Sequence, residues 1–133
     1  MKTTVFLFLS MITVIIAMMH TSGRSPVVSD SDKPAVSFAN DVYPIIEEHC
    51  LPCHLQEERN MSRLFMDNYE LLMEGGFNGP PIEPGNADES LLIKKISPEP
   101  PFGERMPMRG EEYLNDDEIE IIARWINEGA EDN

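Results

Sequence analysis

The sequence has few cysteines and few basic residues, and no stretch alternates regularly between apolar and polar side chains. With two cysteines among 133 residues, the chain lacks the second cysteine pair that usually completes a structural zinc site. Ten lysines and arginines stand against 24 aspartates and glutamates, a formal charge of −14, so binding to nucleic acid, which needs a basic face, is not expected. The missing alternation gives no support for β-strands, and the expected fold class is all-α.

One long apolar run occurs, at the start of the chain. It follows Lys2 and extends from Val5 to Met19, a length of 15 residues, which is short of the roughly 20 that a membrane span needs. A positive residue before an apolar run is typical of an export signal. We therefore expect residues 1–23 to be a signal peptide or an N-terminal membrane anchor, the one expected membrane contact. Either way the rest is exported, to the periplasm or to the outer face of the cytoplasmic membrane.

Residues 24–36 are rich in serine, aspartate and proline, which is typical of a flexible linker. The folded domain is then expected to occupy residues 37–133, fewer than 100 residues. A domain of that size has a thin core and often needs a cofactor or a covalent link. Removing the leader takes away Lys2 and no acid, which brings the charge to −15. This charge serves solubility, or it steers the protein toward a basic partner.

A helix start signal recurs along the domain: an asparagine or aspartate followed three residues later by glutamate. The three pairs are Asp67/Glu70, Asn86/Glu89 and Asn115/Glu118. We predict about four helices. The first starts near Asn40, with Pro44 in its first turn, where a missing N–H is harmless. The others cover residues 68–74, residues 87–96 and a segment after Asn115.

The last predicted helix carries the clearest pattern. Apolar residues recur at helical spacing, and Trp125 widens the stripe that they form: Ile119, Ile122, Ala123 and Ile126. Long loops rich in proline and glycine connect the predicted helices, and such loops build little core by themselves. We therefore expect something large and apolar to fill the middle of the domain.

The run CLPCH, residues 50–54, is the attachment pattern for haem c. Thiols three residues apart, at Cys50 and Cys53, reach two vinyl groups on one edge of a porphyrin and form thioethers. The adjacent His54 then donates an imidazole nitrogen to the iron. A hydrogen-bond acceptor should orient the other nitrogen, and a carbonyl in the loop 79–85 is our expectation. One such motif predicts one covalent haem.

Three other interpretations share this motif. A dithiol oxidoreductase needs a βαβ scaffold, and no strands are predicted. A zinc site would take Cys50, Cys53 and His54 with His49 as a fourth ligand, although adjacent ligands fit a tetrahedron poorly. A plain disulfide between the two cysteines would close a very small loop and leave the thin core unexplained.

The second axial ligand is expected to be a methionine. Five follow the leader: Met61, Met66, Met73, Met106 and Met108. Met66 and Met73 lie in or beside an amphipathic stretch and are expected in the core. Met106 lies in a loop that Pro107 stiffens, which suits a weak Fe–S bond, so we predict Met106 as the ligand. Met108, His49 and an open site are the alternatives.

Nearly all of residues 36–130 resembles the planctomycete type of c-type cytochrome domain, which has the class I cytochrome c fold. The matching runs are VSFANDVYPIIEEHCLPCH, LLMEGGFNGPPIEPGNADESLLIKKI and RMPMRGEEYLNDDEIEIIARWINEGA. The resemblance implies haem attachment at Cys50 and Cys53, a proximal His54, and a distal methionine in a Met-Pro loop at Met106. Two departures stand out: Met108 replaces a second proline, and the segment after His54 is not glycine-rich.

We interpret the chain as a cytochrome c-like bundle of about four helices around one covalent haem, ligated by His54 and Met106. Its expected function is electron transfer to and from redox protein partners, rather than catalysis. Two alternatives belong to other classes. One is a haem-based sensor or ligand-binding module with a displaceable methionine. The other is a small peroxidase-like enzyme, which the missing second haem motif disfavours.

Overall fold

The computed structural model describes residues 33–108 and 112–133. The chain divides into two compact units, Met1–Lys33 and Pro34–Asn133, and the second holds every helix of the described residues. The predicted signal peptide or anchor, residues 1–23, and most of the predicted linker lie outside the described part. None of the described helices is long and apolar enough to cross a membrane.

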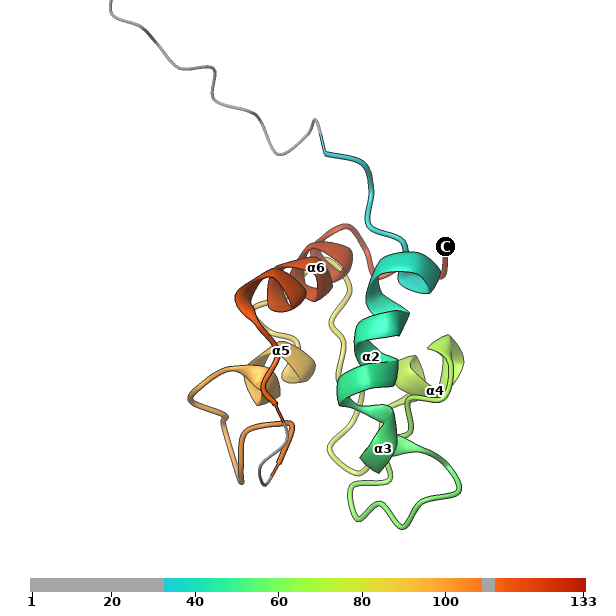
Figure 1. The fold of residues 1–133 in the computed structure, drawn as a ribbon, viewed down its shortest axis with the longest axis vertical. Helices are drawn as coiled ribbons and strands as arrows, with labels where there is room; N and C mark the ends of the chain where they lie inside the picture. Colours follow the sequence, from blue (N-terminus) through green and yellow to red (C-terminus); the bar gives the residue numbers. More distant parts are fainter. Residues whose placement is uncertain (1–32, 109–111) are drawn as a thin grey trace, which may run out of the picture. The chain divides into compact units, whose positions relative to one another are not determined.

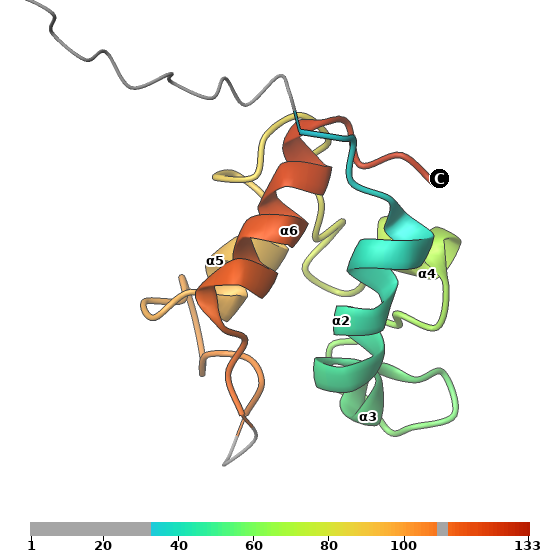
Figure 2. The same cartoon turned by 45° about the horizontal axis from the view of Figure 1, so that its top comes forward.

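The second unit is built from short helices. They are the π-helical turn η2 and five α-helices: η2 Phe38–Val42, α2 Tyr43–His49, α3 Leu51–His54, α4 Tyr69–Glu74, α5 Leu91–Ile96 and α6 Asp116–Asn127. An isolated bridge joins Gly76 and Gly79, and no strand forms within the described residues. The predicted all-α class is confirmed. Both views of the ribbon show α6 lying along α5, with α2, α3 and α4 grouped on the other side (Figures 1 and 2).

The first helical segment begins slightly earlier than predicted. The Ser37 side chain accepts a hydrogen bond from the Asn40 N–H and caps η2, which leads directly into α2. Pro44 lies in the first turn of α2, as predicted. Upstream, Val36 is already buried in the core, and its N–H donates to Glu128 Oε2 at 2.7 Å. The compact unit therefore begins before residue 37.

Two of the predicted helix starts are shifted in the structure. The cap of α4 is Asn68, whose Oδ1 accepts from the Leu71 N–H at 2.9 Å, whereas Asp67 turns away and accepts from the Gln56 N–H. The Asn86 side chain does accept from the Glu89 N–H, but this bond closes a turn, and α5 begins only at Leu91. An isolated capping bond therefore marks a turn as readily as a helix.

The last helix begins as the sequence predicts. Asn115 Oδ1 accepts from the Glu118 N–H at 3.0 Å, and Glu118 Oε2 accepts from the Asn115 N–H at 2.8 Å, so the capping box is complete. Ile122, Trp125 and Ile126 are buried on one face of α6. Three acidic residues in its first turn also suit the positive end of the helix dipole.

An aromatic cluster joins η2, α4 and α6. Phe38 packs against Tyr69 and against Trp125, each with ring centroids 5.3 Å apart. Tyr69 also meets Trp125 edge-on at 6.4 Å. The cluster ties η2, α4 and the end of α6 into one core, since such aromatic pairs add attraction beyond the buried area. The motif-bearing helix α3 lies at the opposite end of α2 from η2, which carries Phe38 (Figure 1).

Candidate haem site

The CLPCH motif forms a single helical turn that continues from α2. Cys50 is the residue between α2 and α3, and its N–H still donates to the Ile46 carbonyl at 2.9 Å. The Cys50 carbonyl in turn accepts from the N–H groups of Cys53 at 3.1 Å and His54 at 3.0 Å. Both cysteines carry free thiols. The turn therefore holds the two thiols and the imidazole on one short, fixed piece of backbone.

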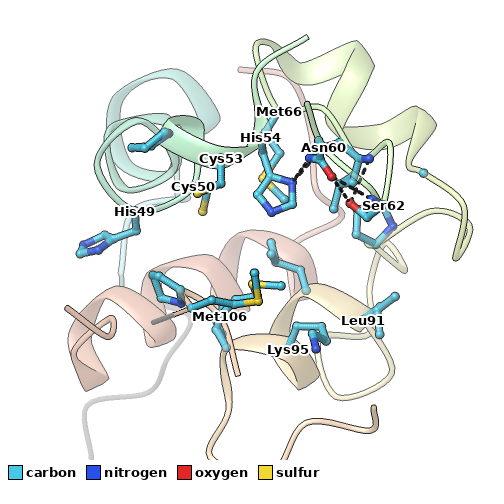
Figure 3. Close-up of a pocket in the computed structure, with 18 of the residues that line it drawn as sticks. His49, Cys50, Cys53, His54, Asn60, Ser62, Met66, Leu91, Lys95 and Met106 are labelled. Carbon is cyan, nitrogen blue, oxygen red and sulfur yellow. Dashed lines mark hydrogen bonds between the residues drawn. The ribbon is translucent and has the colours of Figure 1, made fainter. Parts of the chain in front are cut away.

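A cavity of about 830 Å³ lies against this turn, within the range of about 300–1,000 Å³ that is typical of cofactor sites. Its walls include Cys50, Cys53 and His54, together with Met106 from the loop after α5. Apolar side chains from several elements complete them: Met66, Pro81, Leu91, Leu92, Ile96 and Leu114. In Figure 3 the two cysteines and His54 lie on one side of this space, and Met106 lies on the other, with Leu91 and Lys95.

The His54 ring is held from its Nδ1 side. Nδ1 lies 2.8 Å from the Leu64 carbonyl, so a proton on Nδ1 donates to this oxygen. That tautomer leaves the Nε2 lone pair available to a metal. The prediction that a carbonyl in the loop 79–85 is the acceptor was wrong. The true one lies ten residues after the histidine, in a segment that returns to the motif through a bond from the Met66 N–H to the His54 carbonyl at 2.8 Å.

Asn60 takes part in the same contact and was missed by the sequence analysis. Its Nδ2 donates to the Leu64 carbonyl at 2.7 Å and lies 2.8 Å from His54 Nδ1. Its Oδ1 accepts from both the N–H and the hydroxyl of Ser62, at 2.9 and 2.6 Å, which fixes which end of the amide faces the histidine. When the proton is on Nδ1, His54 shares the Leu64 carbonyl with Asn60; when Nδ1 is unprotonated, it accepts from the Asn60 amide instead. In both cases Asn60 stiffens the loop that supplies the carbonyl.

Met106 is half-buried, and its N–H donates to the Lys95 carbonyl at 2.9 Å. The following residue, Pro107, is buried, whereas Met108 is 42% exposed. Of the other candidates, Met61 is 89% exposed, and Met66 is buried as predicted, although it also borders the cavity. The Met66 N–H is also bonded, to the His54 carbonyl, but Met66 lies on the same side of the cavity as His54, whereas Met106 lies on the other side (Figure 3).

His49 also borders the cavity, but its side chain is bonded to α6. Its Nε2 lies 3.2 Å from Glu118 Oε1, which links the end of α2 to the first turn of α6. In the part of the chain that the structure describes, one group of three side chains brings possible metal ligands within 4.8 Å of one another: Glu48, His49 and Glu118. Neither cysteine nor His54 belongs to it. The zinc interpretation, which needs Cys50, Cys53 and His54 to converge with His49, has no support in this arrangement.

Burial raises the pKa of the Cys50 thiol to about 12, and the nearby Cys53 adds to the rise. An environment that disfavours the thiolate accommodates a neutral thioether without electrostatic cost. The donors on the cavity wall are then two thiols, an imidazole with a free Nε2 and a thioether across the space. Set in an otherwise largely apolar wall, these donors fit haem c.

The comparisons with known proteins agree with this fit. Residues 50–108 match the family model described as planctomycete cytochrome C. The matched stretch begins at the first cysteine and includes His54 and both Met106 and Met108. A search of curated proteins gave no match.

Among solved structures, hydrazine synthase of Kuenenia stuttgartiensis is similar over 75% of this chain, with 24% sequence identity and a TM-score of 0.48. The similar region makes up 16% of that chain. The family assignment accordingly depends on the match at residues 50–108, which covers the attachment motif and the methionine loop together. Residues 50–108 thus match a planctomycete-type cytochrome c domain, and this match supports a c-type cytochrome.

Proposed function

We propose that this protein is a monohaem cytochrome c that transfers single electrons and does not catalyse a reaction of its own. In this proposal one haem c is attached through Cys50 and Cys53, and His54 and Met106 are its axial ligands. The observation that carries the proposal is the shared cavity: both cysteines and His54 line one side of it, and Met106 lines the other. A four-helix bundle around the haem, as expected from the sequence, is part of the same proposal.

Each residue then has a defined task. Cys50 and Cys53 would hold the ring through thioethers, and the Leu64 carbonyl would favour the His54 tautomer that presents Nε2. Met106 supplies a neutral thioether, a ligand that favours ferrous iron relative to a second imidazole. When bound, haem c supplies one iron that alternates between the ferrous and ferric states. The apolar wall limits the access of water to that iron.

A sensor, a ligand-binding module or a peroxidase-like enzyme would need Met106 to leave. The contacts of its loop oppose that movement, since the Met106 N–H is bonded to α5. Electron transfer, in contrast, needs little movement of the ligands between the two oxidation states. We therefore favour electron transfer, in an exported protein that lies in the periplasm or at the outer face of the cytoplasmic membrane.

The first prediction concerns covalent attachment. The protein produced with a cytochrome c maturation system should gain the mass of one haem and keep it after denaturation, because two thioethers do not dissociate. Cys50→Ala/Cys53→Ala should lose the added mass completely, and Cys53→Ala should retain a single link. Mass spectrometry of the denatured chains measures all three. Haem that extracts from the unmodified protein into acidified organic solvent would contradict the proposal.

The second prediction concerns the distal ligand. Met106→Ala should keep the covalent haem but lose the weak near-red absorption band of the ferric, methionine-ligated form, and it should bind carbon monoxide in the ferrous form. Met108→Ala is the matched control, two residues away in the same loop, and should keep the band. The reverse pattern would assign the ligand to Met108. A parent protein that lacks the band and binds carbon monoxide readily would favour a sensor or an enzyme.

The third prediction concerns partners, which we propose to be redox proteins with a basic docking face. The formal charge of −14 should make electron transfer to a positively charged redox protein slow several-fold between about 0.01 M and about 0.15 M salt, as the Debye length shortens from about 30 Å to about 8 Å. Stopped-flow absorption measures the rate, with an acidic redox protein as the control. A rate that is flat across this range would mean that the charge serves solubility alone.

A further inference from the structure

Lys95, near the end of α5, contacts the loop that carries Met106 through both its side chain and its backbone. Its Nζ donates to the Phe102 carbonyl at 2.7 Å and to the Glu104 carbonyl at 2.6 Å. Its own carbonyl accepts from the Met106 N–H at 2.9 Å. Lys95 thus binds the loop at three points, all of which lie within the five residues 102–106.

The loop is shaped to receive this ammonium group. Gly103 has a φ of +60°, a left-handed conformation that turns the carbonyls on either side of it toward the same cation. The Phe102 ring lies beside the ammonium as well, with its centroid 4.8 Å from Nζ. A Cβ added at Gly103 would lie 3.8 Å from Nζ, an ordinary contact, so the glycine is needed for its backbone conformation and not for space.

The neighbouring Lys94 shows that this arrangement is specific. Its ammonium pairs with Glu89 Oε2 at 2.7 Å on the solvent-exposed surface. It makes no hydrogen bond to residues 97–108 in the described part of the chain. Both lysines lie in the last turn of α5, where a positive charge suits the helix dipole equally. The contact with the loop, and not the charge at the helix end, distinguishes Lys95.

We propose that Lys95 is the positioning residue for the distal ligand, holding Met106 at the haem face; this rests on the proposed function, in which Met106 is that ligand. A thioether is a weak, neutral ligand, so its occupancy depends on how often its loop moves away. An external ligand binds only when the methionine has left, and its apparent dissociation constant is the intrinsic constant divided by the open fraction. Lys95 keeps that open fraction small by binding the loop to α5.

The test compares Lys95→Met with Lys94→Met in the haem-loaded protein. Each variant removes one positive charge from the same helical turn, and methionine keeps the apolar stem. Imidazole is the probe, because it is largely neutral above its own pKa and competes with Met106 for ferric iron. We expect Lys95→Met to bind imidazole at least about tenfold more tightly than the parent protein, with a weaker near-red band. Tenfold corresponds to about 1.4 kcal/mol, within reach of the bonds that a charged donor makes. Lys94→Met should bind as the parent does.

Two further variants separate positioning from general stability. Lys95→Arg keeps the charge and the donors and should restore most of the parent affinity. Gly103→Ala leaves Lys95 intact but strains the turn, and it should also tighten imidazole binding. If Lys95→Met fails to keep the parent's helical circular dichroism, Gly103→Ala decides the question alone.

The possible results are distinct. Equal imidazole affinity in Lys95→Met and Lys94→Met, with the near-red band present in the parent, would overturn the role of Lys95 and leave the proposed function intact. A parent protein without the band would overturn methionine ligation, and the role of Lys95 with it. Tight binding in Lys95→Met and Gly103→Ala, but not in Lys94→Met, would establish Lys95 as the residue that holds the ligand.

Discussion

The space between helix α3 and the Met106 loop constrains the whole domain. Five of the six described helices have seven residues or fewer, and α6 has 12, so none is long enough to be stable by itself. They must be stabilised by packing, yet a cavity of about 830 Å³ borders α3, α5 and the loops between them. The aromatic cluster around Trp125 closes the other end of the unit. A large apolar group in the cavity would complete the core that the short helices begin.

The two proposed axial ligands are supported in the same way. Each is fixed by a backbone carbonyl from a neighbouring segment: Leu64 for the His54 ring and Lys95 for the Met106 N–H. In each case a polar side chain then stiffens the arrangement, Asn60 on the histidine side and Lys95 itself on the methionine side. Backbone carbonyls remain neutral at every pH, so neither carbonyl loses its role as an acceptor through titration. That property suits a carrier whose ligands should stay in place in both oxidation states.

Local patterns in the sequence predicted local structure well. The capping box at Asn115 and Glu118, the stripe that buries Ile122 and Ile126, and the helical class were all recovered, because each depends on residues within a turn or two of one another. The shifted cap at Asn68 shows the limit of such local patterns. Two adjacent residues can both act as a helix cap, and tertiary contacts decide which of them does. Asp67 was drawn away by the Gln56 N–H.

Contacts between distant segments were beyond the sequence. Nothing local distinguishes the Leu64 carbonyl from other carbonyls, and Asn60 and Lys95 look like ordinary surface residues until the loops are in place. The motif itself was readable because haem attachment requires two thiols and an imidazole at fixed spacing on one turn. The hydrogen bonds that hold the ligands could not be predicted, because any backbone group brought to the right place can provide them.

The central claim is that the haem forms the core of this domain, and unfolding tests it most directly. Thermal unfolding should be followed by far-ultraviolet circular dichroism for the haem-loaded protein and for Cys50→Ala/Cys53→Ala prepared without haem. The account predicts a sharp transition for the first and a loss of most helical signal, without a cooperative transition, for the second, because binding free energy contributes directly to folding. A haem-free variant that stays helical and unfolds sharply would contradict it.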